Sequence, residues 1–156
     1  MNLENKLLHE LAEAQPVGER HELTTTEGAW SAHLTYDRRE ELSGRLWEVA
    51  LHRNSVLDGD VATWGNRIVQ RVTGLMEPLR VVEVDAKKQE ALLRSAAPTA
   101  KGAQLFYYEI HLRGLANAVV RRFQATHQTG QKRAQVAFAL THESLAKLAA
   151  DITAEK

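Results

Sequence analysis

Strict alternation of apolar and polar side chains is the feature that most constrains the fold of this chain. The stretch WSAHLTY (residues 30–36) places every second residue on one face of an extended backbone, and QLFYYEIHLRG (104–114) repeats the pattern with Phe106, Tyr108, Ile110 and Leu112. A helix would scatter these residues around its axis. The alternation therefore predicts strands with one face in a core and the other toward water.

Six further segments are typical of strands: 21–27, 45–53, 79–85, 90–95, 118–127 and 133–140. The last two follow 104–114 closely, which predicts a three-stranded meander. Residues 86–95 leave two interpretations open. AKKQ is a turn that returns into EALLRS, or KKQEALLRS is a helix.

Three segments show helical spacing instead. Residues 2–15 carry leucines three and four apart and end at Pro16 and Gly18, and a longer pattern runs from Val61 to Leu75 after the candidate N-caps Asp58 and Asp60. Thr141 is a third N-cap, with Leu145, Leu148 and Ile152 behind it.

The resulting order is α-βββ-α-βββββ-α, which predicts an α+β fold: a two-layer sandwich with a mainly antiparallel sheet and helices on one face. At 156 residues the chain has the usual size of one domain, so we expect a single domain over 1–156. Trp30, Trp47 and Trp64 fall on predicted apolar faces and are expected in its core.

Composition and missing motifs restrict the function. The absence of cysteine excludes disulfides, thiolate catalysis and Cys-dependent metal centres. The opening MNLENKLLHELAEAQ contains Glu4 and no uninterrupted apolar run, so we expect no signal peptide, no membrane span and a cytoplasmic location. No Walker loop, GxGxxG, HExxH or GxSxG occurs, which favours a protein that is not an enzyme and needs no cofactor.

Histidines and glutamates share the polar face of the predicted sheet. Adjacent strands could bring these side chains together as ligands of a divalent metal; the candidate set is His33, Glu48, His52, Glu109 and His111. The alternative is that they are ordinary polar residues on the water side of a sheet.

The charge is distributed unevenly along the chain. Residues 1–78 carry 13 acidic and 8 basic side chains, whereas 79–156 carry 7 acidic and 12 basic. The halves could pair within one molecule or between two copies, which predicts self-association as one option. The basic segment near Tyr107 and Phe123 also forms a candidate partner or nucleic-acid patch: Arg113, Arg121, Arg122, Lys132 and Arg133.

The predicted element order resembles that of type III secretion chaperones, which implies binding of unfolded protein segments and dimerisation. GAWSAHLTYDRREELSGRLWEVALHR and LFYYEIHLRG resemble segments of small uncharacterised proteins from planctomycete-type bacteria, a likeness that implies a bacterial source and no particular activity.

Three functional hypotheses follow. The first is a non-catalytic, chaperone-like adaptor that binds a protein partner or forms a homodimer. The second is a small-molecule or metal site on the His/Glu face, and the third is nucleic-acid binding through residues 113–133.

Overall fold

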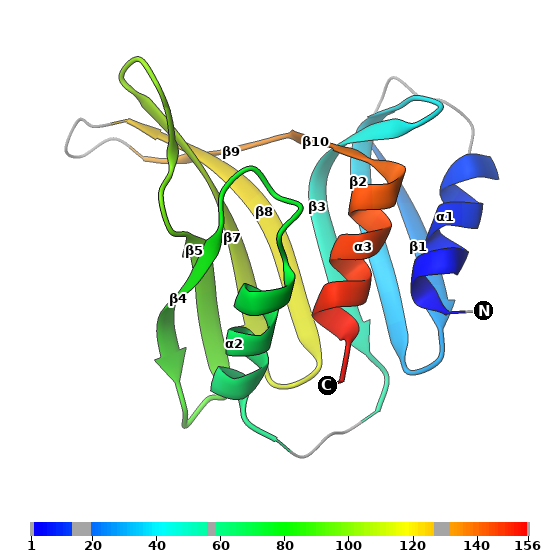
Figure 1. Cartoon of the computed structure of the whole chain (residues 1–156), viewed down its shortest axis with the longest axis horizontal. Coiled ribbons are helices and arrows are strands. Elements are labelled where there is room, and N and C mark those ends of the chain that lie inside the picture. Colours follow the sequence, from blue (N-terminus) through cyan, green and yellow to red (C-terminus); the bar gives the residue numbers. More distant parts are fainter. Residues whose placement is uncertain (1, 14–19, 56–58, 127–131, 156) are drawn as a thin grey trace.

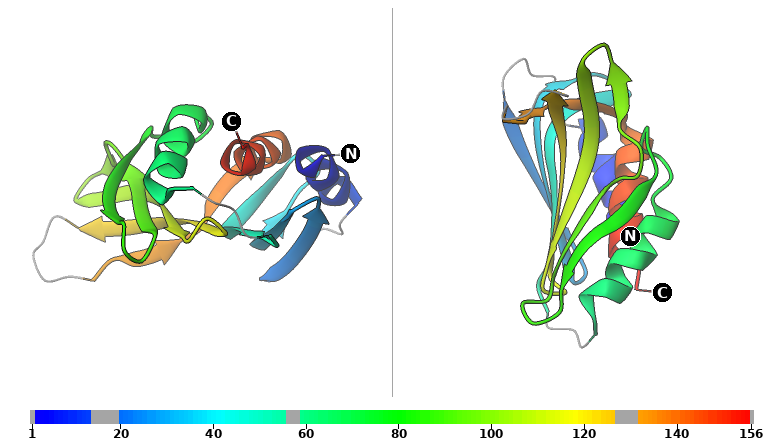
Figure 2. Two further views of the ribbon diagram at one scale, coloured as in Figure 1. Left: turned by 90° about the horizontal axis from the view of Figure 1, so that it is seen from below. Right: turned by 90° about the vertical axis from the view of Figure 1, so that its left-hand side faces the viewer.

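An antiparallel sheet runs through the whole computed structural model, and helices pack against one of its faces (Figures 1 and 2). The structure describes residues 2–13, 20–55, 59–126 and 132–155. Pro16, Gly18, Asp58 and His127, the last residue of the predicted strand 118–127, therefore lie outside the described residues. The predicted α+β class, with a mainly antiparallel sheet and helices on one face, is confirmed.

The N-terminal part consists of α1 (Leu3–Glu13), β1 (His21–Glu27), β2 (Trp30–Arg39) and β3 (Ser43–Arg53). The three strands are the predicted ones and pair as consecutive antiparallel neighbours. The turn between β1 and β2 uses Gly28 at φ 61°, a conformation that costs a glycine little. Arg39 of β2 donates to the carbonyl oxygens of Leu11 and Ala12, and so caps the end of α1.

The second helix, α2 (Val61–Arg71), begins where the sequence predicts and ends earlier. Asp60 is its N-cap, accepting from the Ala62 amide at 3.3 Å and the Thr63 hydroxyl at 3.1 Å. The predicted pattern continued to Leu75, but Val72 is already extended. Gly74 and Pro78 disfavour a further turn of helix, and this stretch instead returns the chain to the sheet.

The open question at residues 86–95 resolves as a hairpin. β4 (Leu79–Asp85) and β5 (Glu90–Ser95) pair antiparallel, with Asp85 opposite Glu90. Gln89, at φ 51°, closes the turn, and its side-chain oxygen accepts from the Val61 amide at 3.0 Å. The side chain of Gln89 thus satisfies one free amide at the start of α2.

The remaining elements are β6 (Thr99–Lys101), β7 (Gln104–Arg113), β8 (Asn117–Thr126), β9 (Ala134–Val136), β10 (Phe138–Thr141) and α3 (His142–Thr153). The main path of the sheet runs β1-β2-β3-β8-β7-β5-β4. The predicted single strand over 133–140 is two strands with different partners: β9 pairs β8, and β10 pairs β3. The cause is that β3 and β8 pair only between 49–52 and 117–120. Beyond that stretch β3 and β8 diverge, and the chain passes from β8 to β3, forming β9 beside β8 and β10 beside β3 (Figure 1).

Trp30 and Trp64 lie in the core as predicted, whereas the prediction for Trp47 is wrong. A β-bulge gives Trp47 no partner on β2, because Thr35 is opposite Glu48 and Tyr36 opposite Leu46. The bulge shifts the alternation by one residue, so Leu46 is buried and Trp47 is half-buried on the other face.

The core between sheet and helices includes Val49, Leu51, Ile110, Leu112, Ile68 and Ile152, all at most 1% exposed. Within the described ranges, no helix is long and apolar enough to cross a membrane.

Candidate functional site on the open sheet face

The helices leave the opposite face of the sheet uncovered (Figure 2), and we call it the open sheet face. Strand alternation determines which residues lie on it: Leu93 and Leu112 face α2 at Gly65, so their neighbours face away. Its centre is made of Leu92 and Arg94 of β5, Tyr107, Glu109 and His111 of β7, and Val119, Arg121 and Phe123 of β8.

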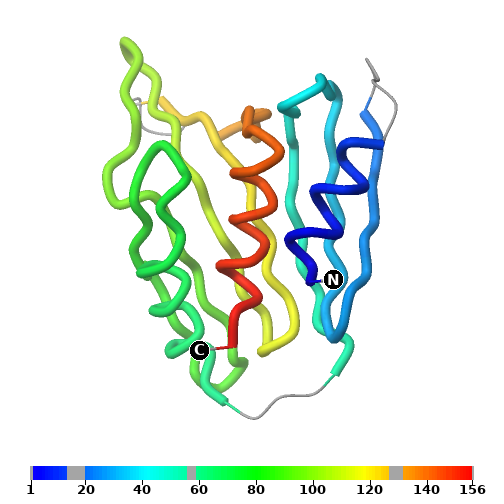
Figure 3. Tube along the Cα trace, turned by 45° about the vertical axis from the view of Figure 1, so that its right-hand side comes forward, coloured from blue at the N-terminus to red at the C-terminus, as the bar shows by residue number. Residues whose placement is uncertain are grey.

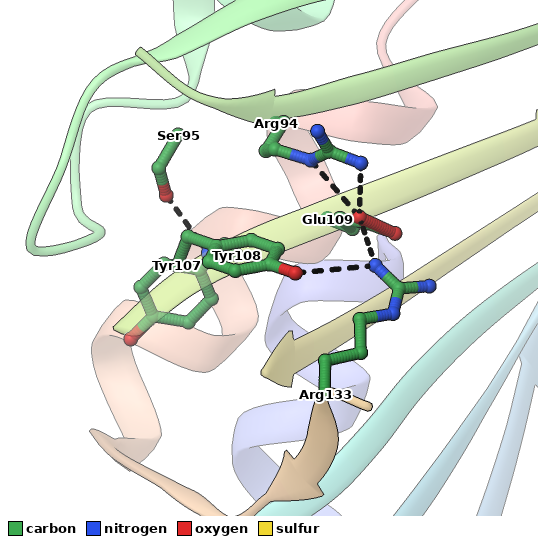
Figure 4. A network of polar contacts seen from close by, with 6 residues as sticks. All are labelled: Arg94, Ser95, Tyr107, Tyr108, Glu109 and Arg133. Carbon is green, nitrogen blue, oxygen red and sulfur yellow. Dashed lines mark hydrogen bonds and ion pairs between the residues drawn. The ribbon is translucent and has the colours of Figure 1, made fainter. Parts of the chain in front are cut away.

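Glutamates and arginines pair across the strands of this face. Arg121 of β8 lies 2.6 Å from Glu48 of β3, and Arg94 of β5 lies 2.8 Å from Glu109 of β7. Arg133, just before β9, also donates to the Glu109 carboxylate, so two guanidiniums converge on one carboxylate (Figure 4). These contacts leave the Glu109 side chain only 8% exposed, although its face carries no helix.

The arginines also stack on the aromatic rings of the open sheet face. Arg94 lies 5.3 Å from the Tyr107 ring centroid, Arg133 lies 3.8 Å from that of Phe123, and the two rings are 6.0 Å apart. Burial opposes the charge of Arg133, but its contacts with Tyr107 and Glu109 outweigh that effect and raise its pKa. The cations are therefore held in place by both carboxylates and rings.

A shallow depression of about 250 Å³ lies between these groups. Its lining mixes charge with apolar surface: Glu83, Leu92, Glu109, His111, Val119, Arg121, Phe123 and Arg133. Because two arginines hold one oxygen of the Glu109 carboxylate, this lining favours recognition of a ligand surface over proton transfer.

The five candidate metal ligands share the open sheet face, but no two are directly opposite one another. Arg121 lies between Glu48 and Glu109, and Ala50 and Val119 lie between His33 and His111. His33 contacts Thr24 at 3.1 Å and His52 contacts Asn117 at 2.8 Å. Among the described residues, no group of three or more His, Asp or Glu side chains is arranged to hold a metal ion.

The predicted basic patch divides between the two faces of the sheet. Arg113, Arg121 and Arg133 lie on the open sheet face, each paired with a carboxylate: Glu90, Glu48 and Glu109. Lys132 is exposed. Including Arg122 was wrong, because successive residues of a strand face opposite sides and Arg122 points toward the helices, where its side chain is only 7% exposed.

Arg122 forms a buried network that the sequence reasoning missed. Its two terminal nitrogens donate to the two oxygens of Glu77 at 3.0 and 3.1 Å, and Ser95 and Thr99 donate to the same carboxylate at 2.7 and 2.8 Å. Burial works to raise the pKa of Glu77, but these hydrogen bonds outweigh it and lower the pKa. The network ties the loop after α2 to the sheet.

The opposite charges of the two halves meet inside the molecule. Glu48 and Glu77 of the acidic half pair with Arg121 and Arg122 of the basic half. This part of the charge asymmetry is therefore satisfied within one copy of the chain.

Comparison of the chain with models of protein families, with curated proteins and with solved structures found no match.

Proposed function

We propose that this domain is a non-catalytic protein-binding module whose open sheet face holds a protein partner or a second copy of the chain. The observation that carries the proposal is the one-sided coverage of the sheet. The uncovered side keeps half-buried Tyr107, Val119 and Phe123 at its centre among ion-paired arginines.

The composition of the open sheet face supports a protein as the ligand. Arginine and aromatic residues are the side chains most enriched at the energetic centres of protein interfaces. Here Arg94, Arg133 and Tyr107 are already fixed by Glu109 and by one another, which reduces the entropy cost of binding. The element order that resembles type III secretion chaperones also supports a chaperone-like module.

Nucleic-acid binding is the weaker candidate for the same face. A nucleic-acid backbone is bound by cations that are free to contact its phosphates. Arg94, Arg121 and Arg133 each already contact a carboxylate. Arg133 also covers the Phe123 ring on which a base would stack.

The proposal includes a bacterial, cytoplasmic setting. A chain without cysteine suits a reducing compartment such as the cytoplasm.

Sedimentation velocity over a rising concentration series tests the second-copy form of this proposal. We expect self-association in the parent chain and its loss in Val119→Glu, because that substitution puts an unpaired charge at the centre of the open sheet face. Val84→Glu is the matched control: Val84 is 43% exposed on β4 and pairs with Ala91, whose side chain faces the helices.

Photo-cross-linking tests the protein-partner form. A photoreactive residue at position 119, compared with one at position 84, is expected to give a discrete protein adduct in lysate of the source cells. A strictly monomeric chain that also gives no adduct specific to position 119 would overturn the proposed function.

A further inference from the structure

A separate pocket of about 530 Å³ opens on the helix side of the sheet, between the start of α2 and the end of α3. Figures 1 and 3 show the C-terminal end of α3 beside α2. Trp30, Trp64 and Leu115 form apolar walls, and Arg53 and Arg67 bring cations to them. This volume lies within the usual range of small-molecule sites, about 300–1,000 Å³.

The Arg53 side chain of the pocket is largely withdrawn from water, and Arg67 is half-buried. Arg53 has a side chain 8% exposed and lies 5.6 Å from the Trp30 ring centroid. Its acidic partner, at 2.8 Å, is Glu155 in the segment after α3, and Glu155 is 62% exposed. Arg67 donates to the main-chain oxygen of the same residue. One exposed residue after α3 thus supplies an acceptor to each arginine, and Arg53 Nε also donates to the Ser55 hydroxyl at 3.1 Å.

Two further donors in the pocket lack an acceptor. Within the part of the chain that the structure describes, Trp30 Nε1 and Arg67 Nε are buried without a hydrogen-bond partner. Buried donors are nearly always paired, so unpaired ones in a pocket indicate a missing acceptor. The neighbouring indole differs, since Trp64 Nε1 donates to the Ile152 carbonyl oxygen at 2.9 Å.

We propose that this pocket binds a small organic monocarboxylate with an aromatic or aliphatic body. The ligand carboxylate takes the place of the Glu155 side chain on Arg53. Trp30 Nε1 and Arg67 Nε are covered in the structure, and a small shift of the side chains around them lets both donate to the acceptor atoms of the ligand. The body of the ligand lies against the indole rings and Leu115. Bidentate pairing with carboxylates is a property of the arginine guanidinium.

The charge count of the pocket favours a single negative charge. Among the described residues that line the pocket, Asp60 is the one acid left facing Arg53 and Arg67 once Glu155 is displaced, and its carboxylate caps α2. A monoanion balances this site, whereas a phosphate dianion adds repulsion from Asp60. The pocket is on the opposite side of the sheet from the open sheet face, so this proposal does not rest on the proposed protein binding.

Isothermal titration with phenylacetate as the probe tests the ligand class. We expect saturable binding, a change in tryptophan emission, and no binding of phenylacetamide, which has the same body without the charge. Equal binding of the amide would overturn the proposal, as would tighter binding of phenyl phosphate or no heat at millimolar phenylacetate.

Three variants test the residues. Glu155→Gln is expected to bind phenylacetate several-fold more tightly, because its neutral amide competes less for Arg53. Arg53→Gln is expected to bind about tenfold or more weakly, through loss of a charged hydrogen bond. Arg113→Gln, whose side chain is 68% exposed on the other face, is the matched control and binds like the parent chain.

Trp30→Phe provides a readout if Arg53→Gln fails to fold. It keeps a smaller aromatic wall and removes the indole donor, so binding weakens, whereas the lost ring volume lowers the melting temperature without unfolding the chain. Unchanged affinity in both Glu155→Gln and Trp30→Phe would refute the proposed arrangement.

Discussion

Removing Arg122 is expected to destabilise the fold strongly, because its partner Glu77 is buried with it. Both side chains are almost fully covered, at 7% and 4% exposed, and they share two hydrogen bonds. Arg122→Met keeps much of the length and apolar stem of the side chain but leaves the Glu77 carboxylate without its cation.

Breaking a buried ion pair by removing one partner costs about 3–5 kcal/mol. For a domain of this size, 1 kcal/mol corresponds to about 2–4 °C in Tm, so the expected loss is about 6–20 °C. The double variant Glu77→Gln/Arg122→Met removes both charges. It is expected to be more stable than the sum of the single effects predicts, since neither charge is left alone.

The pH dependence distinguishes the two single variants. Without Arg122, burial is opposed only by the hydrogen bonds of Ser95 and Thr99, so the pKa of Glu77 rises relative to the parent chain. The penalty of Arg122→Met therefore shrinks as the pH falls from 7 toward 4.5 and the carboxyl becomes protonated. The penalty of Glu77→Gln stays constant over that window, because Arg122 keeps its charge. Below 4.5 the parent chain itself loses stability, since the folded pKa of Glu77 lies under its ordinary value of 4.5.

Urea denaturation at several pH values, followed by circular dichroism, measures these free energies of unfolding. A loss below about 1 kcal/mol in Arg122→Met, the magnitude of an exposed pair, would refute the buried-pair reasoning. So would additive effects in the double variant.

Three other predictions concern stability. In urea denaturation, Trp64→Ala is expected to lower the free energy of unfolding by about 3–5 kcal/mol. Trp47→Ala is expected to lower it by about half as much, because Trp47 is only half-buried, and equal losses would contradict the bulge. Thr141→Ala removes the α3 cap and should cost about 1 kcal/mol, whereas an unchanged midpoint would argue against the cap. Burial and the charge of Arg39 lower the pKa of His142, so thermal stability should fall as the pH drops below 6.5, with a shallower fall in His142→Gln.

Local periodicity was sufficient to place most strands and helices. The segments 21–27 and 79–85 match β1 and β4, because alternation of side chains depends only on neighbouring residues, whereas local pattern left 90–95 open between strand and helix. The start of α2 followed in the same way from Asp60, which accepts from an amide two residues ahead.

Two arginines carried a signal that the sequence reasoning did not use. Arg53 and Arg122 each occur in phase with the buried residues of their strands, and both are buried. A cation in phase with a core face indicates a buried partner or a pocket: a pocket for Arg53 and Glu77 for Arg122. Arg39 carried no such signal, because it is out of phase with Leu34 and Tyr36 and is buried only through the irregular register of β2 and β3 after Tyr36.

The sequence by itself determined the type of most elements and which face of most strands is apolar. Only the tertiary structure decided which strands are neighbours, and therefore that Glu48 meets Arg121, 73 positions away, across the β3–β8 junction. It also decided that β3 bulges at Trp47 and that the 133–140 segment divides between two partners. These features depend on register between distant strands, which the packing of the whole core selects and local alternation does not encode.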